Sequence, residues 1–271
     1  MSEGRGPSFI APGIDMVEEL TAKLIGLNIE LEQKNRQLQA SETARVSILS
    51  NISHDLRSPL AALRGAVDRL LSGTVSQEEG ARLTQIIDLR VSVLERLVDE
   101  LYFSVTLEQP EFSLNMECIP IVPFLEEYFI TLEISGRFDA RQAVLNVPED
   151  MDCRADIDTH RFLRVMDNIV SNALRHTGEG DLIELGCSGG DDFIEIYLRD
   201  SGEGISPDDL PHIFKRTYTA SRARTPGETG SGLGLYIAKS IIEKHGGEIS
   251  CASEPGHGAI FKITLPTAAE K

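Results

Sequence analysis

Long apolar runs, paired cysteines and positive charge are all scarce in this chain of 271 residues. No apolar run approaches the length of a membrane-spanning helix, so the sequence as given predicts no membrane segment. The four cysteines, Cys118, Cys153, Cys187 and Cys251, form no CxxC pair and have no histidine near them at metal-ligand spacing. They indicate reduced, packed thiols in a reducing compartment rather than a disulfide framework or a zinc site.

The charge balance is acidic. The chain has 26 lysines and arginines against 43 aspartates and glutamates, which gives a formal net charge of -17. This balance argues against a nucleic-acid backbone as the main partner and disfavours an anionic membrane surface. The leader MSEGRGPSFIAPG lacks the charged-then-apolar pattern of a signal peptide. We therefore expect a soluble protein of the cytoplasm.

A long helix is predicted to follow residues 1–13, which we expect to be a flexible leader. Apolar residues recur there every seven positions, with a companion seam between them: Val17, Leu20, Leu24, Leu27, Leu31 and Leu38. Polar residues fill the intervening positions, which favours a two-stranded coiled coil over residues 14–44. The alternative is an amphipathic helix packed within one chain, but no flanking segment offers it a core.

Two further helical stretches predict a hairpin over residues 45–109. The first has an apolar stripe with spacings of three and four residues, made of Leu49, Ile52, Leu56, Leu60, Leu63, Val67 and Leu70. Glycines and small polar residues at 72–80 break the helix, and a second stripe follows at Leu83, Ile87, Val91, Leu94, Leu97, Val98 and Leu101. One hairpin cannot bury both faces, so we expect two chains to pair as a homodimeric four-helix bundle.

The remaining sequence predicts an α+β domain over residues 112–267, followed by a short tail at 268–271. We expect helices at 122–134, 158–177 and 232–247. Strands are expected at 112–121, 142–147, 181–188, 193–200, 248–253 and 259–266, with a Gly-Gly-Asp turn at 189–191. Helices would cover one face of a mixed sheet.

His54 is the first candidate for chemistry. Each residue of a helix turns by about 100°, so His54 lies about 200° from the apolar stripe residues two positions to either side. It is therefore expected to face solvent, on the same side as Ser58 and flanked by Asp55. Pro59 cannot donate to the carbonyl of Asp55 and would loosen the helix there. An exposed imidazole oriented by a carboxylate is a nucleophile at neutral pH, although a plain surface histidine is the alternative.

Two glycine clusters form the second candidate. DSGEGI at 200–205 ends a strand with Asp200, Gly202 and Gly204, and TGSGLGL at 229–235 places Gly230, Gly232 and Gly234 before a helix. Helix N-termini bind phosphate readily. The second loop lacks the Lys-Ser/Thr ending of a Walker-type loop. Because the clusters flank a long polar segment, we expect residues of about 206–230 to form a lid over a nucleotide.

Paired amides form the third candidate. Asn168 and Asn172 are one turn apart on the helix predicted at 158–177, and their side-chain oxygens could ligate a hydrated Mg²⁺. Arg175 and His176 extend this row toward the expected phosphates. The alternative for either asparagine alone is an ordinary place on a helix surface.

Taken together, residues 41–267 resemble the transmitter region of bacterial sensor histidine kinases. SHDLRSPL is similar to the H box of that family, DNIVSNALRHT to the N box, DSGEGI to the G1 box, HIFKRTY to the F box and GSGLGL to the G2 box. The motifs also occur in the order that the family shows. The resemblance implies a dimeric helical bundle followed by an ATP-binding α/β sandwich.

The resemblance also implies residue roles. His54 would accept the phosphoryl group, Asp55 would act as its acid/base neighbour, and Ser58 would stand at the position associated with dephosphorylation of the partner. Asn172, with Asn168 nearby, would hold Mg²⁺, and Asp200 would receive the adenine amino group. The other nucleotide-binding positions implied are Arg175, His176, Gly202, Gly204, Arg216, Gly230, Gly232 and Gly234.

Three positions depart from the family pattern. Ser58 replaces the usual threonine or asparagine, which mildly disfavours a phosphatase-dominant protein, Thr217 replaces a second phenylalanine of the F box, and Ala259 replaces a threonine near adenine. None removes a group essential for phosphoryl transfer.

The sequence therefore predicts a kinase that uses ATP and Mg²⁺ to phosphorylate its own His54 and passes the group to an aspartate of a separate response regulator, acting in trans. Input would come through a separate or upstream sensor module. The competing hypotheses are an ATP-binding dimeric scaffold and a phosphatase-dominant regulator of the same partner.

Overall fold

The computed structural model describes residues 12–73, 75–109, 111–148, 153–190, 192–219 and 232–268. The backbone divides into two compact units, Met1–Ser50 and Asn51–Lys271. Along the first helix, some residues are described by their backbone alone. Among the described residues, no helix is both long enough and apolar enough to span a membrane.

The first unit contains the beginning of α1 (Pro12–Leu71), a helix of 60 residues. Leu20, Leu24, Leu27 and Leu31, four members of the predicted heptad seam, expose between 56% and 62% of their surface in the single chain. The side chains of Val17 and Leu38, at the ends of the seam, lie outside the described set. Exposed leucines at heptad spacing are what a coiled coil requires before its partner is present, so the coil stays a prediction.

The second unit begins with the hairpin of α1 and α2 (Gln77–Thr106). Ser76 caps α2, because its hydroxyl accepts the N–H of Glu79 at 3.2 Å. The Arg69 side chain also donates from Nε to Glu79 Oε1 at 3.0 Å, which ties the two helices together beside the turn. The helix α1 continues through Pro59 without ending there, so any loosening at that residue is local.

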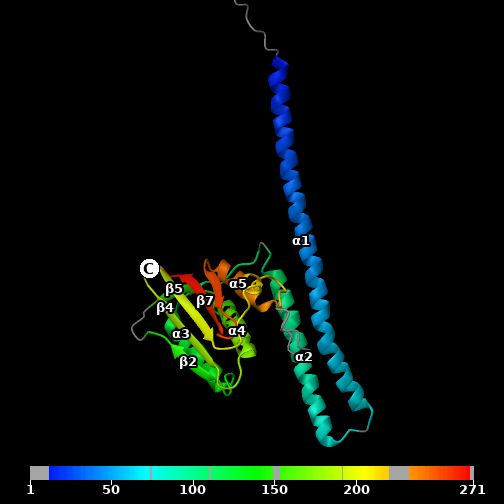
Figure 1. Cartoon of the computed structure of the whole chain (residues 1–271), viewed down its shortest axis with the longest axis vertical. Coiled ribbons are helices and arrows are strands. Elements are labelled where there is room, and N and C mark those ends of the chain that lie inside the picture. The colour runs from blue at the N-terminus through cyan, green and yellow to red at the C-terminus, as the bar shows by residue number, and fades with distance from the viewer. Residues whose placement is uncertain are drawn as a thin grey trace, which may run out of the picture. The chain divides into compact units, whose positions relative to one another are not determined.

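The rest of the second unit is the predicted α+β domain (Figure 1). Its helices are α3 (Ile121–Ile134), α4 (Thr159–His176) and α5 (Gly234–Lys244), with a short 3₁₀ turn η1 (Leu210–His212). Its strands are β1 (Glu117–Pro120), β2 (Gln142–Asn146), β3 (Arg154–Ile157), β4 (Leu182–Gly189), β5 (Phe193–Asp200), β6 (Glu248–Ser253) and β7 (Ala259–Pro266).

Five of these strands form a mixed sheet in the order β2-β4-β5-β7-β6. The β2–β4 pair is parallel and the other pairs are antiparallel. Alternation decides which face is buried: Ile194, Ile196 and Leu198 of β5 are buried, and the intervening residues are more exposed. On the opposite face, Tyr197 donates to Glu184 at 3.1 Å.

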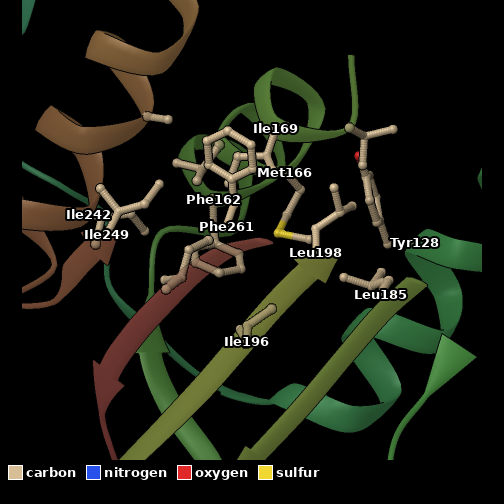
Figure 2. Packing of buried hydrophobic residues seen from close by; sticks show 14 of the residues in the cluster. Tyr128, Phe162, Met166, Ile169, Leu185, Ile196, Leu198, Ile242, Ile249 and Phe261 are labelled. Carbon is tan, nitrogen blue, oxygen red and sulfur yellow. The ribbon is translucent and has the colours of Figure 1, made fainter. Parts of the chain in front are cut away.

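The core lies between this sheet and the helices. Figure 2 shows Phe162, Met166 and Ile169 of α4 packed over Leu198 and Phe261 of the sheet. All but Leu198, at 3%, expose at most 1% of their surface. The apolar positions of α4 recur at helical spacing, so the side of α4 away from the core is left for Asn168 and Asn172, the paired amides of the sequence analysis, which are partly exposed.

One strand was not predicted. β3 pairs with β1 as a separate antiparallel two-stranded sheet, with Cys118 opposite Asp156. It has only four residues, and only Ala155 and Ile157 are buried. The strand predicted at 112–121 is correspondingly shorter, because regular pairing is limited to residues 117–120.

Candidate functional site

Asp200, the last residue of β5, is 97% buried, since only 3% of its surface is exposed. Its Oδ1 accepts two backbone N–H groups, from Gly202 at 3.0 Å and from Ala259 at 3.3 Å. Burial raises the pKa of Asp200 above its usual value, and the two N–H donors partly offset that effect. Both donors engage Oδ1, so Oδ2 is the oxygen that a ligand donor would reach.

Gly202 and Gly204 are needed beside Asp200 because backbone approaches them closely. A Cβ on Gly202 would lie 2.1 Å from the carbonyl oxygen of His176, at the end of α4. A Cβ on Gly204, whose φ is 72°, would lie 2.1 Å from the carbonyl oxygen of Glu254. Any side chain would therefore push the segment after β5 away from α4 and from the β6–β7 turn.

The paired amides on α4 lie beside the start of α5. Asn168 Nδ2 donates to the carbonyl oxygen of Gly234 at 2.9 Å, across 66 residues of sequence. A Cβ on Gly234 would be 3.4 Å from Asn168 Oδ1, an ordinary van der Waals distance, so this contact does not itself require a glycine. Asn172 is half-buried one turn further along α4. The contact joins two motifs that the sequence analysis could only treat separately.

The two asparagines could contribute ligands to a Mg²⁺ site but could not form such a site by themselves. Asn168 donates through Nδ2, which leaves Oδ1 for a cation or a water molecule. In the described part of the chain, no group of three or more His, Cys, Asp and Glu side chains could hold a metal ion. Mg²⁺ typically keeps several waters and takes substrate phosphates as ligands. The donors present here fit that mode of binding.

The basic residues predicted to meet the nucleotide are not equivalent. Arg175 is exposed near the end of α4, and His176 Nδ1 lies 2.7 Å from Glu203 Oε1. Arg216 is directed to α2 instead: Nη2 donates to Ser104 Oγ at 3.0 Å and Nη1 donates to Glu108.

The predicted lid is only partly described. The structure covers its residues 206–219, including η1, while Gly230 lies outside the described residues. The next described residue, Gly232, has a φ of 63°, and a Cβ on it would lie 2.6 Å from the carbonyl oxygen of Tyr218. The two flanks of the segment are therefore packed against each other.

His54 is placed by its backbone in α1, within the second unit, and its side chain lies outside the described set. Asp55 is half-buried and Ser58 is exposed. The solvent-facing orientation of His54 therefore stays a prediction.

Comparison with known families accounts for both parts of the second unit. Residues 44–110 match the model of the His Kinase A phosphoacceptor domain. Residues 157–269 match the model of histidine kinase-, DNA gyrase B- and HSP90-like ATPases. The chain belongs to the sensor histidine kinases. The structure contains their transmitter region, and its ATPase domain implies ATP binding.

Individual relatives agree with this assignment. The sensor protein SrrB of Staphylococcus aureus (strain NCTC 8325 / PS 47) is 36% identical over 222 residues, which are 80% of this chain and 37% of the relative. The chain thus spans little more than a third of the length of that curated relative. The Acinetobacter baumannii histidine kinase AdeS has the same fold with a TM-score of 0.62 and 23% identity, over 79% of this chain and 97% of that one.

A third relative was solved together with another protein. Histidine kinase ThkA, in complex with the response regulator protein TrrA, matches with a TM-score of 0.66 and 23% identity, over 84% of this chain and 64% of that one. The likeness shows that the helical hairpin and the α+β sandwich have the expected histidine kinase fold.

Sequence reasoning missed Gly258 in the site. A Cβ there would lie 1.9 Å from the carbonyl oxygen of Asp200, and the φ of Gly258 is 79°. The next residue, Ala259, supplies one of the two N–H groups that hold Asp200 Oδ1. The available signal was a Gly-x-Gly spacing at 256–258 directly before a strand.

Proposed function

We propose that the chain is an ATP-dependent protein histidine kinase that phosphorylates its own His54 and passes the phosphoryl group to an aspartate of a separate response regulator. The observation that carries the proposal is that the ATPase domain combines the contact of Asn168 with Gly234 and the buried carboxylate of Asp200. It brings an amide row, a glycine-rich helix start and a buried carboxylate to the ATPase domain of a chain that also contains a phosphoacceptor hairpin.

Asp200 would select adenine. Its Oδ1 is already held by two backbone donors, so Oδ2 would accept the exocyclic amino group of the base. The backbone N–H groups at the start of α5 would receive phosphate oxygens, because a helix N-terminus carries partial positive charge. Asn168 and Asn172 would contribute side-chain oxygens to Mg²⁺. Bound Mg²⁺·ATP supplies a γ-phosphoryl group whose charge is partly neutralised.

His54 would be the nucleophile. One ring nitrogen forms the N–P bond as the bond between the γ-phosphorus and the bridging oxygen of ADP breaks. The other nitrogen gives its proton to Asp55, the neighbouring carboxylate. The rest of the rate enhancement would come from holding the two reactants in line.

The chain would act as a homodimer, as its phosphoacceptor domain implies. Large apolar side chains of α2 are exposed in the single chain, among them Leu89 at 58% and Val98 at 54%. Pairing of two hairpins would bury such residues. The regulator would be a separate protein, by analogy with ThkA, which was crystallised with TrrA. The signal would enter through the coiled coil from a separate or upstream sensor module.

Phosphorylation with radiolabelled ATP tests the proposal. The unmodified chain should acquire an acid-labile label, and His54→Gln should acquire none while still binding ATP. Label that persists in His54→Gln would refute the assignment of the phosphoacceptor. Asn172→Ala should lose Mg²⁺-dependent nucleotide binding, and unaltered binding would move the metal site elsewhere.

A second incubation separates the competing hypotheses. Labelled chain is mixed with candidate response regulators, and transfer to a regulator aspartate is followed over time. A kinase transfers label, a scaffold acquires none from ATP, and a phosphatase-dominant protein removes label from a regulator faster than it supplies it.

A further inference from the structure

The side chain of Arg216, in the F box, is bound to the end of α2. Nη1 donates to Glu108 and Nη2 donates to Ser104 Oγ at 3.0 Å. The same Glu108 oxygen accepts the hydroxyl of Tyr236 at 2.9 Å, and the Arg216 guanidinium carbon lies 5.4 Å from the centre of the Tyr236 ring. Glu108, in the turn that directly follows α2, therefore joins the end of the hairpin to two side chains of the ATP-binding domain.

These contacts lie beside the predicted phosphate site. Tyr236 is in the first turn of α5, two residues after Gly234, whose carbonyl oxygen binds Asn168. A guanidinium above the Tyr236 ring is therefore close to the helix N-terminus where phosphates are expected. Glu108 and Ser104 each accept an N–H from a different terminal nitrogen of Arg216, so the guanidinium would have to turn away from them to present both nitrogens to a phosphate.

The contact between Arg216 and Glu108 is also weak enough to be replaced by a contact between Arg216 and a phosphate. The Glu108 side chain keeps 52% of its surface exposed, so water screens its attraction for Arg216. Arg216 Nε is buried and has no hydrogen-bond partner in the described structure, so the guanidinium is not fully satisfied on α2. A polyphosphate carries several negative charges and would compete well against a single, half-exposed carboxylate.

We propose that Glu108 competes with the phosphates of ATP for Arg216, so that nucleotide binding and the attachment of Arg216 to α2 exclude each other. Coupling of this kind is reciprocal. ATP would release the Arg216 side chain from α2, and a movement of the last turn of α2 that withdraws Glu108 would raise the affinity for ATP. The inference rests on the proposed function only in requiring that the ATPase domain binds ATP.

Binding of a non-hydrolysable ATP analogue with Mg²⁺ to the full chain tests the inference. Glu108→Gln should tighten binding by about two- to fivefold, the equivalent of a partly exposed ion pair. Glu111→Gln, which neutralises an exposed carboxylate three residues later, is the matched control and should bind as the unmodified chain does. Tyr236→Phe removes the hydroxyl that donates to Glu108 and that also contacts Ser240. Glu108 would then be held less firmly beside Arg216, so nucleotide binding should tighten by less than it does in Glu108→Gln.

A double-mutant cycle gives the decisive result. Arg216→Gln should weaken binding, and in that background Glu108→Gln should have no further effect. Two results would overturn the inference: an unchanged affinity of Glu108→Gln in folded protein, or a gain that persists without Arg216. Neither of these affinity measurements depends on His54. A chain that binds the analogue but never labels His54 would refute the proposed kinase activity and leave this test intact.

Discussion

Replacement of Gly258 by alanine should strongly impair the nucleotide site through one added methyl group. Gly256 and Gly258 lie in the same turn before β7 and both have a φ of 79°. Alanine at either position must adopt a left-handed conformation, which costs about 1 kcal/mol. A Cβ on Gly256 would meet nothing within 4 Å, whereas one on Gly258 would lie 1.9 Å from the carbonyl oxygen of Asp200. Gly256→Ala is therefore a control for backbone strain alone.

The consequence for the site follows from the size of the clash. Real Cβ contacts essentially never fall below 3.0 Å, so the Gly258 and Asp200 backbones would have to separate by at least 1.1 Å. Asp200 is the buried carboxylate expected to receive adenine, and a misplacement of about 1 Å can lower a rate by about a hundredfold. Gly256→Ala should lose about 1 kcal/mol of stability with little change in function.

The assay combines chemical unfolding of the two variants with ATP titration and autophosphorylation. Gly258→Ala should lose about two orders of magnitude in autophosphorylation rate, and Gly256→Ala should keep most of it. Equal losses in the two variants, or normal ATP binding by folded Gly258→Ala, would show that the close approach to Asp200 does not position the site.

Two further changes test single side chains. Asp200→Asn keeps an acceptor at Oδ1 but replaces Oδ2 with a donor, so ATP affinity should fall about tenfold or more; titration with an unchanged affinity would remove Asp200 from the site. His245 is buried and neutral, because Nε2 accepts the N–H of Asp158 and Nδ1 faces the carbonyl of Ile241. Burial lowers its pKa below the usual 6.5, so stability should be complete above about pH 6.5 and fall as the pH decreases toward the folded-state pKa. Unfolding curves measured in that range should lose this slope in His245→Gln.

Elements with strong periodicity could be predicted from the sequence almost to the residue. β5 and β7 were expected at 193–200 and 259–266 and are found there, because strict alternation gives each strand one buried face. The helix α4 was equally clear from its amphipathic pattern. β3 was missed because four residues with two buried positions give too short a pattern to distinguish from a loop.

The site was predictable only in its parts. Glycine clusters and paired amides each suggested a ligand, but their contact through Asn168 and Gly234 depends on the packing of α4 against α5. The partner of Arg216 could not be predicted at all. Glu108 is separated from it by 108 residues and stands at the end of α2 with no motif around it. Such a pair arises from tertiary packing and leaves no periodic trace in the sequence.

The acidic composition of the chain affects how it can bind a polyphosphate such as ATP. With a formal net charge of -17, the protein presents an unfavourable mean potential to a polyphosphate, so binding depends on local donors. Two of the basic residues predicted to meet ATP already contact a carboxylate: His176 lies beside Glu203 and Arg216 beside Glu108. His176 contacts Glu203 through Nδ1 alone, which leaves Nε2 for a phosphate. The guanidinium of Arg216 is instead turned toward Glu108 and Ser104, so a phosphate must draw it away from Glu108. Glu203 belongs to the ATP-binding domain itself, but Glu108 belongs to the phosphoacceptor hairpin. Only the exchange at Arg216 can therefore make ATP affinity depend on the position of the hairpin helix α2.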